Sequence, residues 1–210
     1  MMKRLTIVLG TKNPHKVREI MAIYRLSGRK PAIRFIQLRR FDNIPEVKET
    51  GQTYLANAAK KAITWAKYTG QPVLAEDSGI EIKALNWQPG LRSARFASDS
   101  RHRNATDKEN IRKLLALLSG LPMSKRTARY RCSAVIALPN GKIIARAQGI
   151  CWGRIALKPK GRNGFGYDPI FIPAHSAARG RLTFGQLPAR LKHCISHRGI
   201  ALRKIFRKIS

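Results

Sequence analysis

The sequence predicts an α/β domain built on a central twisted mixed sheet. Short β-branched runs alternate with helical patterns, beginning with a strand-like run at residues 5–10 and a helical pattern from Pro14. Residues 139–142, Pro-Asn-Gly-Lys, separate two further strand-like runs and are typical of a β-hairpin. With 210 residues, 43% of them hydrophobic, the chain has the length and composition of one packed domain. We therefore expect a single domain over residues 1–210.

The first half of the chain predicts three strands and two helices. Pro14 stands in the first turn of a helix whose apolar residues recur at helical spacing. Thr53 is a helix-capping residue and Gly70 a helix-ending one, so an alanine-rich helix lies between them. The third strand is expected to end at the Glu-Asp-Ser-Gly sequence of residues 76–79. In order, the predicted elements are strand 5–10, a helix from residue 14, strand 33–38, loop 42–51, helix 53–68 and strand 73–75.

The second half predicts one more helix before the hairpin and a basic helix at the end. Apolar and polar residues alternate over residues 80–84, which is typical of a half-exposed strand. Thr106 and Glu109 form a capping box ahead of a helix at residues 111–118. The remaining predicted elements are the hairpin strands 128–138 and 143–152, a glycine-rich loop at 161–166, a short strand at 170–172 and a helix over 196–208.

The chain is strongly basic. It holds 42 Lys and Arg residues against 11 Asp and Glu residues, for a formal net charge of +31. Such a charge favours polyanionic partners, either nucleic acid or phosphorylated ligands. The hydrophobic content excludes a disordered basic tail, and no apolar run approaches the roughly 18 residues of a membrane span. Cys132, Cys151 and Cys194 are odd in number and widely spaced, which indicates neither a disulfide framework nor a zinc site and favours a cytoplasmic location.

The turn between the first strand and the first helix is a candidate phosphate site. A helix N-terminus offers free amide groups and the positive end of the helix dipole, and both bind phosphate. A lysine in the first turn adds a charge to the same phosphate. In the alternative interpretation, Asn13 simply caps the helix and the lysine is solvated. The candidate residues of this segment are Thr11, Lys12, Asn13, Pro14, His15 and Lys16.

Adjacent carboxylates make a candidate metal site. Glu76 and Asp77 follow a buried strand in a chain that has few acidic residues. Mg²⁺ binds one or two carboxylates and leaves its other positions to water and substrate phosphates. Glu49, at the end of a polar loop, is a candidate third oxygen donor. The alternative is an ordinary turn, because Asp-Ser-Gly is also typical of turns.

A glycine-rich loop and its aromatic residues form a third candidate. Phe165, Gly166, Tyr167 and Asp168 offer a stacking face that a backbone or base can approach closely. Asp168 can orient a base or hold a neighbouring arginine. The alternative is a structured turn with buried aromatic residues.

The last predicted helix begins with a polar cluster. His197 and Arg198 can hydrogen-bond a base or a phosphate, the arginine through its rigid fork of donors, and Lys192 precedes them closely. The alternative is a basic helix terminus, or a helix that faces nucleic acid.

Together and in this order, these segments resemble the inosine/xanthosine triphosphate pyrophosphatase family. The resemblance spans residues 5–205 and implies an elongated α/β fold with two lobes and a cleft between them, usually in a homodimer. It also implies hydrolysis of ITP, dITP and XTP to the monophosphate and pyrophosphate with Mg²⁺. The matching motifs are Thr11-x-Asn13-x-x-Lys16, Glu49-Thr50-Gly51 with Asn57-Ala58, Asp77-Ser78-Gly79, Pro89-Gly90-x-x-Ser93-Ala94-Arg95, Ala105-Thr106-Asp107-x-x-Asn110, residues 164–171 and residues 195–202.

The resemblance also implies a role for each candidate residue. Asp77 is expected to be the general base and a metal-associated carboxylate, with Glu49 and Glu76 as its metal partners. Lys16 is expected to take part in catalysis and, with Thr11, Asn13 and Lys192, to hold the triphosphate. The residues implied for the nucleotide pocket are Ser78, Phe165, Gly166, Tyr167, Asp168, His197 and Arg198.

The chain departs from the family pattern at several positions, and the departures leave a rival hypothesis open. Glu76 replaces an aspartate, which keeps the carboxylate but lengthens its reach, and Ala56 replaces a glutamate. Lys12 and Lys48 replace a small and an acidic residue, so the periphery is more basic. The rival is a basic nucleic-acid-binding protein on the same fold with lost or weak activity. The three retained acids of the predicted metal site favour the enzyme.

Overall fold

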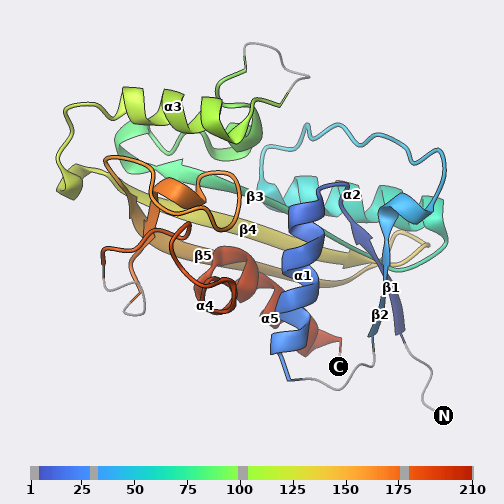
Figure 1. Ribbon diagram of the computed structural model, residues 1–210. Helices are drawn as coiled ribbons and strands as arrows, with labels where there is room; N and C mark the ends of the chain where they lie inside the picture. The colour runs from blue at the N-terminus through green and yellow to red at the C-terminus, as the bar shows by residue number, and fades with distance from the viewer. Residues whose placement is uncertain (1–4, 29–32, 99–103, 176–179, 210) are drawn as a thin grey trace. The chain divides into compact units, whose positions relative to one another are not determined.

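The computed structural model describes residues 5–28, 33–98, 104–175 and 180–209. It contains a six-stranded mixed sheet with the strand order β2-β1-β3-β4-β5-β6 (Figure 1). Strand β1 is parallel to β2 and to β3, whereas β5 and β6 are antiparallel. The predicted α/β class with a mixed sheet is therefore confirmed. The strands are β1 (Leu5–Gly10), β2 (Ile33–Gln37), β3 (Val73–Ile82), β4 (Thr127–Ala137), β5 (Ile143–Ile155) and β6 (Phe171–Pro173).

Helices lie in the segments between the strands, except in the turn between β4 and β5, and at the end of the chain. The α-helices are α1 (Pro14–Leu26), α2 (Tyr54–Thr69), α3 (Asp107–Leu117), α4 (Ala189–Ile195) and α5 (His197–Lys208). Short 3-10 helices are η1 (Leu38–Arg40), η2 (Lys83–Leu85), η3 (Gly90–Arg95), η4 (Met123–Lys125) and η5 (Asp168–Ile170). Within the described ranges, no helix combines the length and the apolar content needed to cross a membrane.

The chain forms two compact units. The first contains the segment up to Ser78, Cys132–Gly149 and the segment from His197 onwards, and the second contains Gly79–Arg131 and Ile150–Ser196. Strands β3, β4 and β5 each contribute residues to both units.

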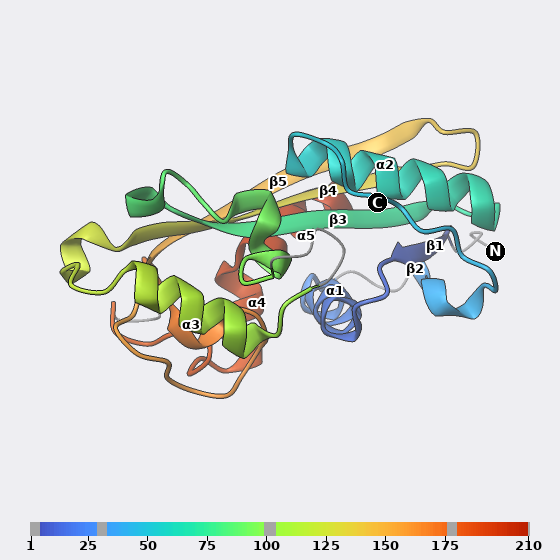
Figure 2. The same cartoon turned by 90° about the horizontal axis from the view of Figure 1, so that it is seen from above.

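In the first unit, helices cover both faces of the sheet. Side chains alternate along a strand, so neighbouring residues belong to different layers. Ile7 and Leu9 of β1 pack in one cluster with α1 and α5, whereas Val8 packs in another with α2. Figure 2 shows α1 and α2 on opposite sides of β3. Helix α5 approaches β5 closely at Gly149, where a Cβ atom would collide with the carbonyl oxygen of His197.

The helix termini confirm the capping predictions. Thr53 caps α2 by accepting a hydrogen bond from the amide of Ala56, and the helix ends at Gly70 with φ +64°. That left-handed conformation strains any residue with a Cβ atom. Thr106 and Glu109 form the predicted capping box at α3. The predicted hairpin is also present, because the amide of Gly141 donates to the carbonyl of Leu138 between β4 and β5.

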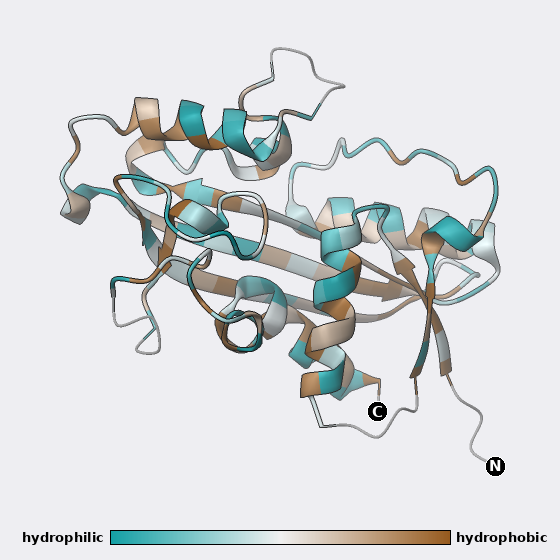
Figure 3. Cartoon of the chain, in the orientation of Figure 1, coloured by the Kyte–Doolittle hydropathy of each residue, from teal (hydrophilic) through white to brown (hydrophobic). Residues whose placement is uncertain are grey.

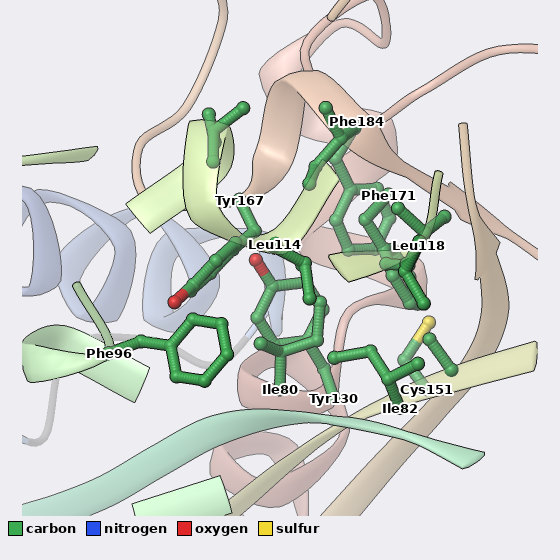
Figure 4. Packing of buried hydrophobic residues seen from close by; sticks show 14 of the residues in the cluster. Ile80, Ile82, Phe96, Leu114, Leu118, Tyr130, Cys151, Tyr167, Phe171 and Phe184 are labelled. Atoms are coloured by element: carbon green, nitrogen blue, oxygen red, sulfur yellow. The ribbon is translucent and has the colours of Figure 1, made fainter. Parts of the chain in front are cut away.

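The second unit has its own core. Leu114 of α3 and Leu118, the residue after its end, pack against Ile80 and Ile82 of β3. Aromatic side chains pack around these four residues (Figure 4). The rings of Tyr130 and Phe171 meet edge to face with centroids 4.7 Å apart. Helix α3 has an apolar side for this core and a charged side for solvent, which appears as alternating hydrophobic and hydrophilic segments in Figure 3.

Strand β3 differs from its prediction. The sequence predicts a strand that ends at residues 76–79 and a separate strand after them, but the structure has one continuous strand, Val73–Ile82. Glu, Asp, Ser and Gly are poor strand formers, and their order is typical of a turn. Strand β3 lies next to β4 in the sheet, and its pairing with β1 ends at Ala75, so these four residues continue the strand beyond the end of β1 despite this preference. As a result Glu76 and Asp77 lie within the strand.

Candidate active site

Strand β3 presents two buried carboxylates to opposite faces of the sheet in the first unit. Glu76 contacts residues of α1 and α5, whereas Asp77 contacts residues of α2. This separation follows from the alternation of side chains along a strand. Two distinct charge clusters result, one around each carboxylate.

The Glu76 cluster is a buried network of two cations and two acids. Lys16 Nζ lies 2.8 Å from Glu76 Oε1, and Arg198 Nη2 lies 3.2 Å from the same oxygen. Arg198 Nη1 donates to Glu19 Oε2 at 2.6 Å. Burial opposes ionisation of Glu76, whose side chain is 1% exposed, but Arg198 and Lys16 hold the pKa of its carboxyl well below the usual range. Glu76 is therefore ionised in the folded protein.

The Asp77 cluster combines a second carboxylate with a lysine and an amide. Asn57 Nδ2 donates to Asp77 Oδ2 at 3.1 Å. Lys61 Nζ lies 3.4 Å from Asp77 Oδ1 and 2.6 Å from Glu49 Oε1, so one ammonium group joins both acids. Burial raises the pKa of Asp77 above its ordinary value, and although Lys61 opposes the rise, Glu49 adds to it. Asp77 is thus a stronger base than an ordinary aspartate.

The Asp77 cluster has the donor chemistry of a magnesium site. Mg²⁺ needs one or two protein carboxylates, and Asp77 and Glu49 already face a common positive charge on Lys61. In the described residues, no three His, Cys, Asp or Glu side chains are grouped so as to hold a metal ion. Glu76 was predicted as a metal ligand beside Asp77, but it faces the other side of the strand and is paired with Lys16 and Arg198. The geometry thus favours Asp77 and Glu49.

In the turn after β1, Asn13 caps the helix, as the alternative interpretation predicts. Lys16 is not solvated as that interpretation also predicts. The side chain of Asn13 accepts hydrogen bonds from the amides of His15 and Lys16, at 2.9 and 3.3 Å. The amide of Asn13 donates to the hydroxyl of Thr11. Lys12, Pro14 and His15 are exposed in the turn, whereas the Lys16 side chain reaches inward to its ion pair with Glu76.

The start of α5 belongs to the Glu76 cluster. Arg198 Nη2 donates to the hydroxyl oxygen of Ser78 at 3.0 Å, so the structure brings these two predicted pocket residues together. His197 is buried at the first position of the helix. Burial opposes the charge on Arg198, yet Glu76 and Glu19 raise the pKa of its guanidinium above the usual value.

The glycine-rich loop of the second unit is held by Asp168. Its carboxylate accepts from the amide of Phe165 at 2.8 Å and from Lys192 Nζ at 2.5 Å. Lys192 Nζ lies 5.2 Å from the centre of the Phe165 ring, a cation–π contact. The structure therefore brings three predicted site residues of this unit into one cluster.

Tyr167 and Gly166 have different surroundings in the same loop. The Tyr167 hydroxyl donates to the carbonyl of Ser93 at 2.8 Å, and its ring packs in the core of the unit. This contact matches the alternative of a structured turn with a buried aromatic residue. The amide of Gly166 donates to the carboxylate of Asp107 at 2.7 Å.

Comparison with known proteins decides the family. The Ham1 family matches residues 7–208 of the chain. The chain belongs to the Ham1 family. The dITP/XTP pyrophosphatase of Desulforamulus reducens is 42% identical over 201 residues, covering 95% of this chain and 93% of that protein. The dITP/XTP pyrophosphatase of Coxiella burnetii is 42% identical over 205 residues, covering 96% and 94%.

Solved structures agree with the Ham1 assignment. A HAM1 protein from Coxiella burnetii aligns with a TM-score of 0.82 at 38% identity and covers 98% of each chain. The dITP/XTP pyrophosphatase from Mycobacterium abscessus aligns with a TM-score of 0.70 at 36% identity, covering 93% of this chain and 94% of that one. The family resemblance found from the motifs is thereby confirmed.

Four residues of this Ham1 chain enter the clusters without having been predicted there: Asn57, Lys61, Glu19 and Cys132, whose thiol donates to Glu76. Lys61 lies four residues after Asn57 on α2, and both contact Asp77. Glu19 lies three residues after Lys16 on α1, and both belong to the Glu76 cluster. Residues three or four apart share a helix face, so this spacing was the available signal.

Proposed function

We propose that this chain is a Mg²⁺-dependent nucleoside triphosphate pyrophosphatase that acts on deaminated purine nucleotides. Water is added across the bond between the α-phosphorus and its bridging oxygen, so that ITP, dITP or XTP gives the monophosphate and pyrophosphate. Membership of the Ham1 family supports the reaction, as do the names of relatives that cover nearly the whole chain. The observation that carries the proposal is the Asp77 cluster, a buried carboxylate with a raised pKa beside a second acid.

Asp77 is the proposed general base. A base is most effective when its pKa approaches the operating pH, and before Mg²⁺ binds, burial moves the pKa of Asp77 in that direction. The hydrogen bond from Asn57 and the contact with Lys61 fix the two carboxylate oxygens, so the group is oriented before substrate binds. Asp77 then takes the proton of the attacking water.

Asp77 and Glu49 are the residues proposed to hold Mg²⁺. When bound, the ion supplies positive charge that neutralises phosphate oxygens during the displacement. Lys16, which is partly exposed, is proposed to contribute a charge to the triphosphate, together with Thr11, Asn13 and Lys192. Glu76 keeps Lys16 in place through their ion pair.

Arg198 and the pocket residues are proposed to select the base. Hypoxanthine and xanthine carry an oxygen at C6, where adenine carries an amino group. A buried donor that pairs with the oxygen faces another donor in adenine and is left unsatisfied, which discriminates strongly. Ser78, Phe165, Gly166, Tyr167, Asp168 and His197 are proposed to complete the recognition.

A product-resolved substrate panel tests this function. ITP, dITP, XTP, ATP and GTP are each incubated with the protein and Mg²⁺, and the products are identified. We expect pyrophosphate and the monophosphate from the first three, with much lower rates on ATP and GTP. Release of orthophosphate, or equal rates on ATP, would contradict the proposal.

The loop before α2 offers a matched pair of variants that test the proposed role of Glu49 as a Mg²⁺ ligand. Glu49→Gln removes a proposed ligand, whereas Glu46→Gln removes an exposed acid three residues earlier. We expect Glu49→Gln alone to raise the Mg²⁺ concentration needed for half-maximal rate. If both variants behave like the parent protein, Glu49 is not a ligand.

We further propose a homodimer in the cytoplasm, as the resemblance implies. The charge of +31 on each chain opposes association, so the dimer should strengthen as salt screens the repulsion. Light scattering at several salt and protein concentrations measures the mass. The mass of one chain under every condition would contradict the dimer.

A further inference from the structure

One side of the sheet in the second unit carries aromatic and basic side chains toward solvent. On β5, Cys151 and Ile155 point into the core of the unit, so Ile150, Trp152 and Arg154 point the other way. Trp152 is 46% exposed and Ile150 is 38% exposed. Large apolar side chains exposed together are a feature of interaction surfaces.

The neighbouring strands add charge to the same side. Ala128 and Tyr130 of β4 pack in the core, so Arg129 and Arg131 share the outward side with Trp152. Arg129 Nε donates to Glu81 Oε2 at 2.6 Å, and Arg131 Nη1 lies 3.6 Å from Glu81 Oε1. We call the outward residues Glu81, Arg129, Arg131, Ile150, Trp152 and Arg154, together with Trp87, the outer sheet face.

Trp87 joins this face from the loop after β3. The guanidinium carbon of Arg129 lies 4.1 Å from the centre of the Trp87 ring and 5.1 Å from that of Trp152. The two indole rings meet edge to face at 6.0 Å. The result is a cluster of two indoles around one guanidinium group, fixed at its other edge by Glu81.

The backbone of Trp87 is held in an unfavourable conformation. Its φ is +64°, in the left-handed region that bulky residues rarely adopt. The amide of Trp87 donates to the carbonyl of Ile82 at 2.9 Å, which closes the loop. Strained backbone that the surrounding structure maintains tends to occur at functional sites. Nothing in the Asp77 or Glu76 cluster involves this residue.

We propose that the outer sheet face binds single-stranded nucleic acid. Indole rings and guanidinium planes stack on unpaired bases, and arginines contact the phosphates that follow. Three arginines against one glutamate leave the face positive, which complements a polyanion. A second copy of the chain fits less well, because a two-fold interface sets a patch against itself and brings these arginines together.

Single strands fit this face better than duplexes. In a duplex the bases are stacked on one another, so their faces are not available to Trp152 or Trp87. The arginines alone would bind a duplex through phosphates, and so would any other basic surface of this chain. The indoles therefore distinguish the proposed surface from the general effect of a +31 charge.

The test measures binding of a labelled single-stranded oligothymidylate by fluorescence anisotropy. The ionic strength is about 0.15 M, where exposed charges more than about 8 Å apart are largely screened. Trp152→Ala removes an exposed ring of the outer sheet face, and Tyr68→Ala removes a ring of similar exposure, 45%, from helix α2. We expect Trp152→Ala to bind about tenfold more weakly, while Tyr68→Ala binds like the parent.

Two further variants exclude a structural effect. Trp152→Phe keeps a stacking ring and should restore most of the affinity. Trp152→Ala should keep the thermal unfolding temperature and nucleotide hydrolysis rate of the parent, because Trp152 is half exposed and outside the proposed catalytic residues. Arg154→Gln should remove about one phosphate contact. The slope of the logarithm of the binding constant against the logarithm of the salt concentration should then become less steep by roughly 0.7, the value for a single strand.

Three results would overturn the proposal. If Trp152→Ala and Tyr68→Ala lose the same affinity, the binding comes from the net charge of the chain and not from the outer sheet face. Tighter binding of the matching duplex than of the single strand would exclude stacking on the indoles. A dimer that Trp152→Ala dissociates, measured by light scattering without nucleic acid, would assign the face to a second copy of the chain.

Discussion

Arg198 and Glu19 form a buried ion pair that joins the last helix to the first across 179 positions of the sequence. Arg198 Nη1 donates to Glu19 Oε2 at 2.6 Å, and the other end of the guanidinium group reaches Glu76 and Ser78. One side chain therefore connects α5, α1 and β3. Because the group is buried, its position is set by these contacts.

Removing Arg198 should destabilise the protein more than neutralising Glu19. Without the guanidinium, two buried acids lose a cation, and such losses cost about 3–5 kcal/mol. Glu19→Gln leaves Arg198 its contacts with Glu76 and Ser78, so the expected cost is smaller, about 1–3 kcal/mol. Urea unfolding of Arg198→Ala and Glu19→Gln measures the difference. Equal stabilities of the two variants would contradict the larger role assigned to Arg198.

Tyr167 should weaken the protein at alkaline pH. Burial raises the pKa of its phenol above the ordinary value, and Asp107 adds to the rise. Above about pH 10 the unfolded phenol loses its proton before the folded one. The unfolded state then binds fewer protons, so the free energy of unfolding falls with rising pH.

Tyr167→Phe is the matched variant for this pH effect. At neutral pH it should cost about 1 kcal/mol through the lost hydrogen bond to Ser93. Above about pH 10 the gap between parent and variant should narrow, since phenylalanine has no proton to lose. Urea unfolding across this range measures it. A constant gap would mean that the phenol titrates normally.

Gly164 should not tolerate alanine. Its φ is +79°, and a Cβ atom there would collide with the carboxylate of Asp168. We expect Gly164→Ala to destabilise the protein by about 1–3 kcal/mol and to displace Asp168 from Lys192. Gly180, with φ +62° and open space around its Cβ position, is the control for backbone strain alone. If Gly164→Ala and Gly180→Ala lower the free energy of unfolding equally, the collision of the new Cβ atom with Asp168 adds nothing to the backbone strain.

Local sequence signals predicted most of the fold. Thr53 and Thr106 cap the N-termini of α2 and α3, and Gly70 ends α2, as their chemistry predicts. The Pro-Asn-Gly-Lys sequence forms the turn of the β4–β5 hairpin. Helix α4, Ala189–Ile195, was not predicted. A second error fell on β3, where four poor strand formers lie inside a continuous strand. Pairing within the sheet decided that segment, and pairing partners are distant in the sequence.

The candidate site shows the same limit. The motifs predicted Asp77, Glu49 and Lys16 as site residues, but not that Glu76 and Asp77 face opposite sides of one strand. That arrangement follows only once the strand is known to continue through both residues. Glu19 acquires its partner from a helix at the far end of the chain, which no local pattern predicts.

Asp77→Asn tests the central claim most directly. The substitution keeps the size of the side chain and removes its capacity to accept a proton. We predict that hydrolysis of ITP with Mg²⁺ falls by about a hundredfold or more, while ITP binding, measured by calorimetry, stays detectable. A variant that binds ITP and hydrolyses it at a near-normal rate would contradict the assignment of Asp77 as the base.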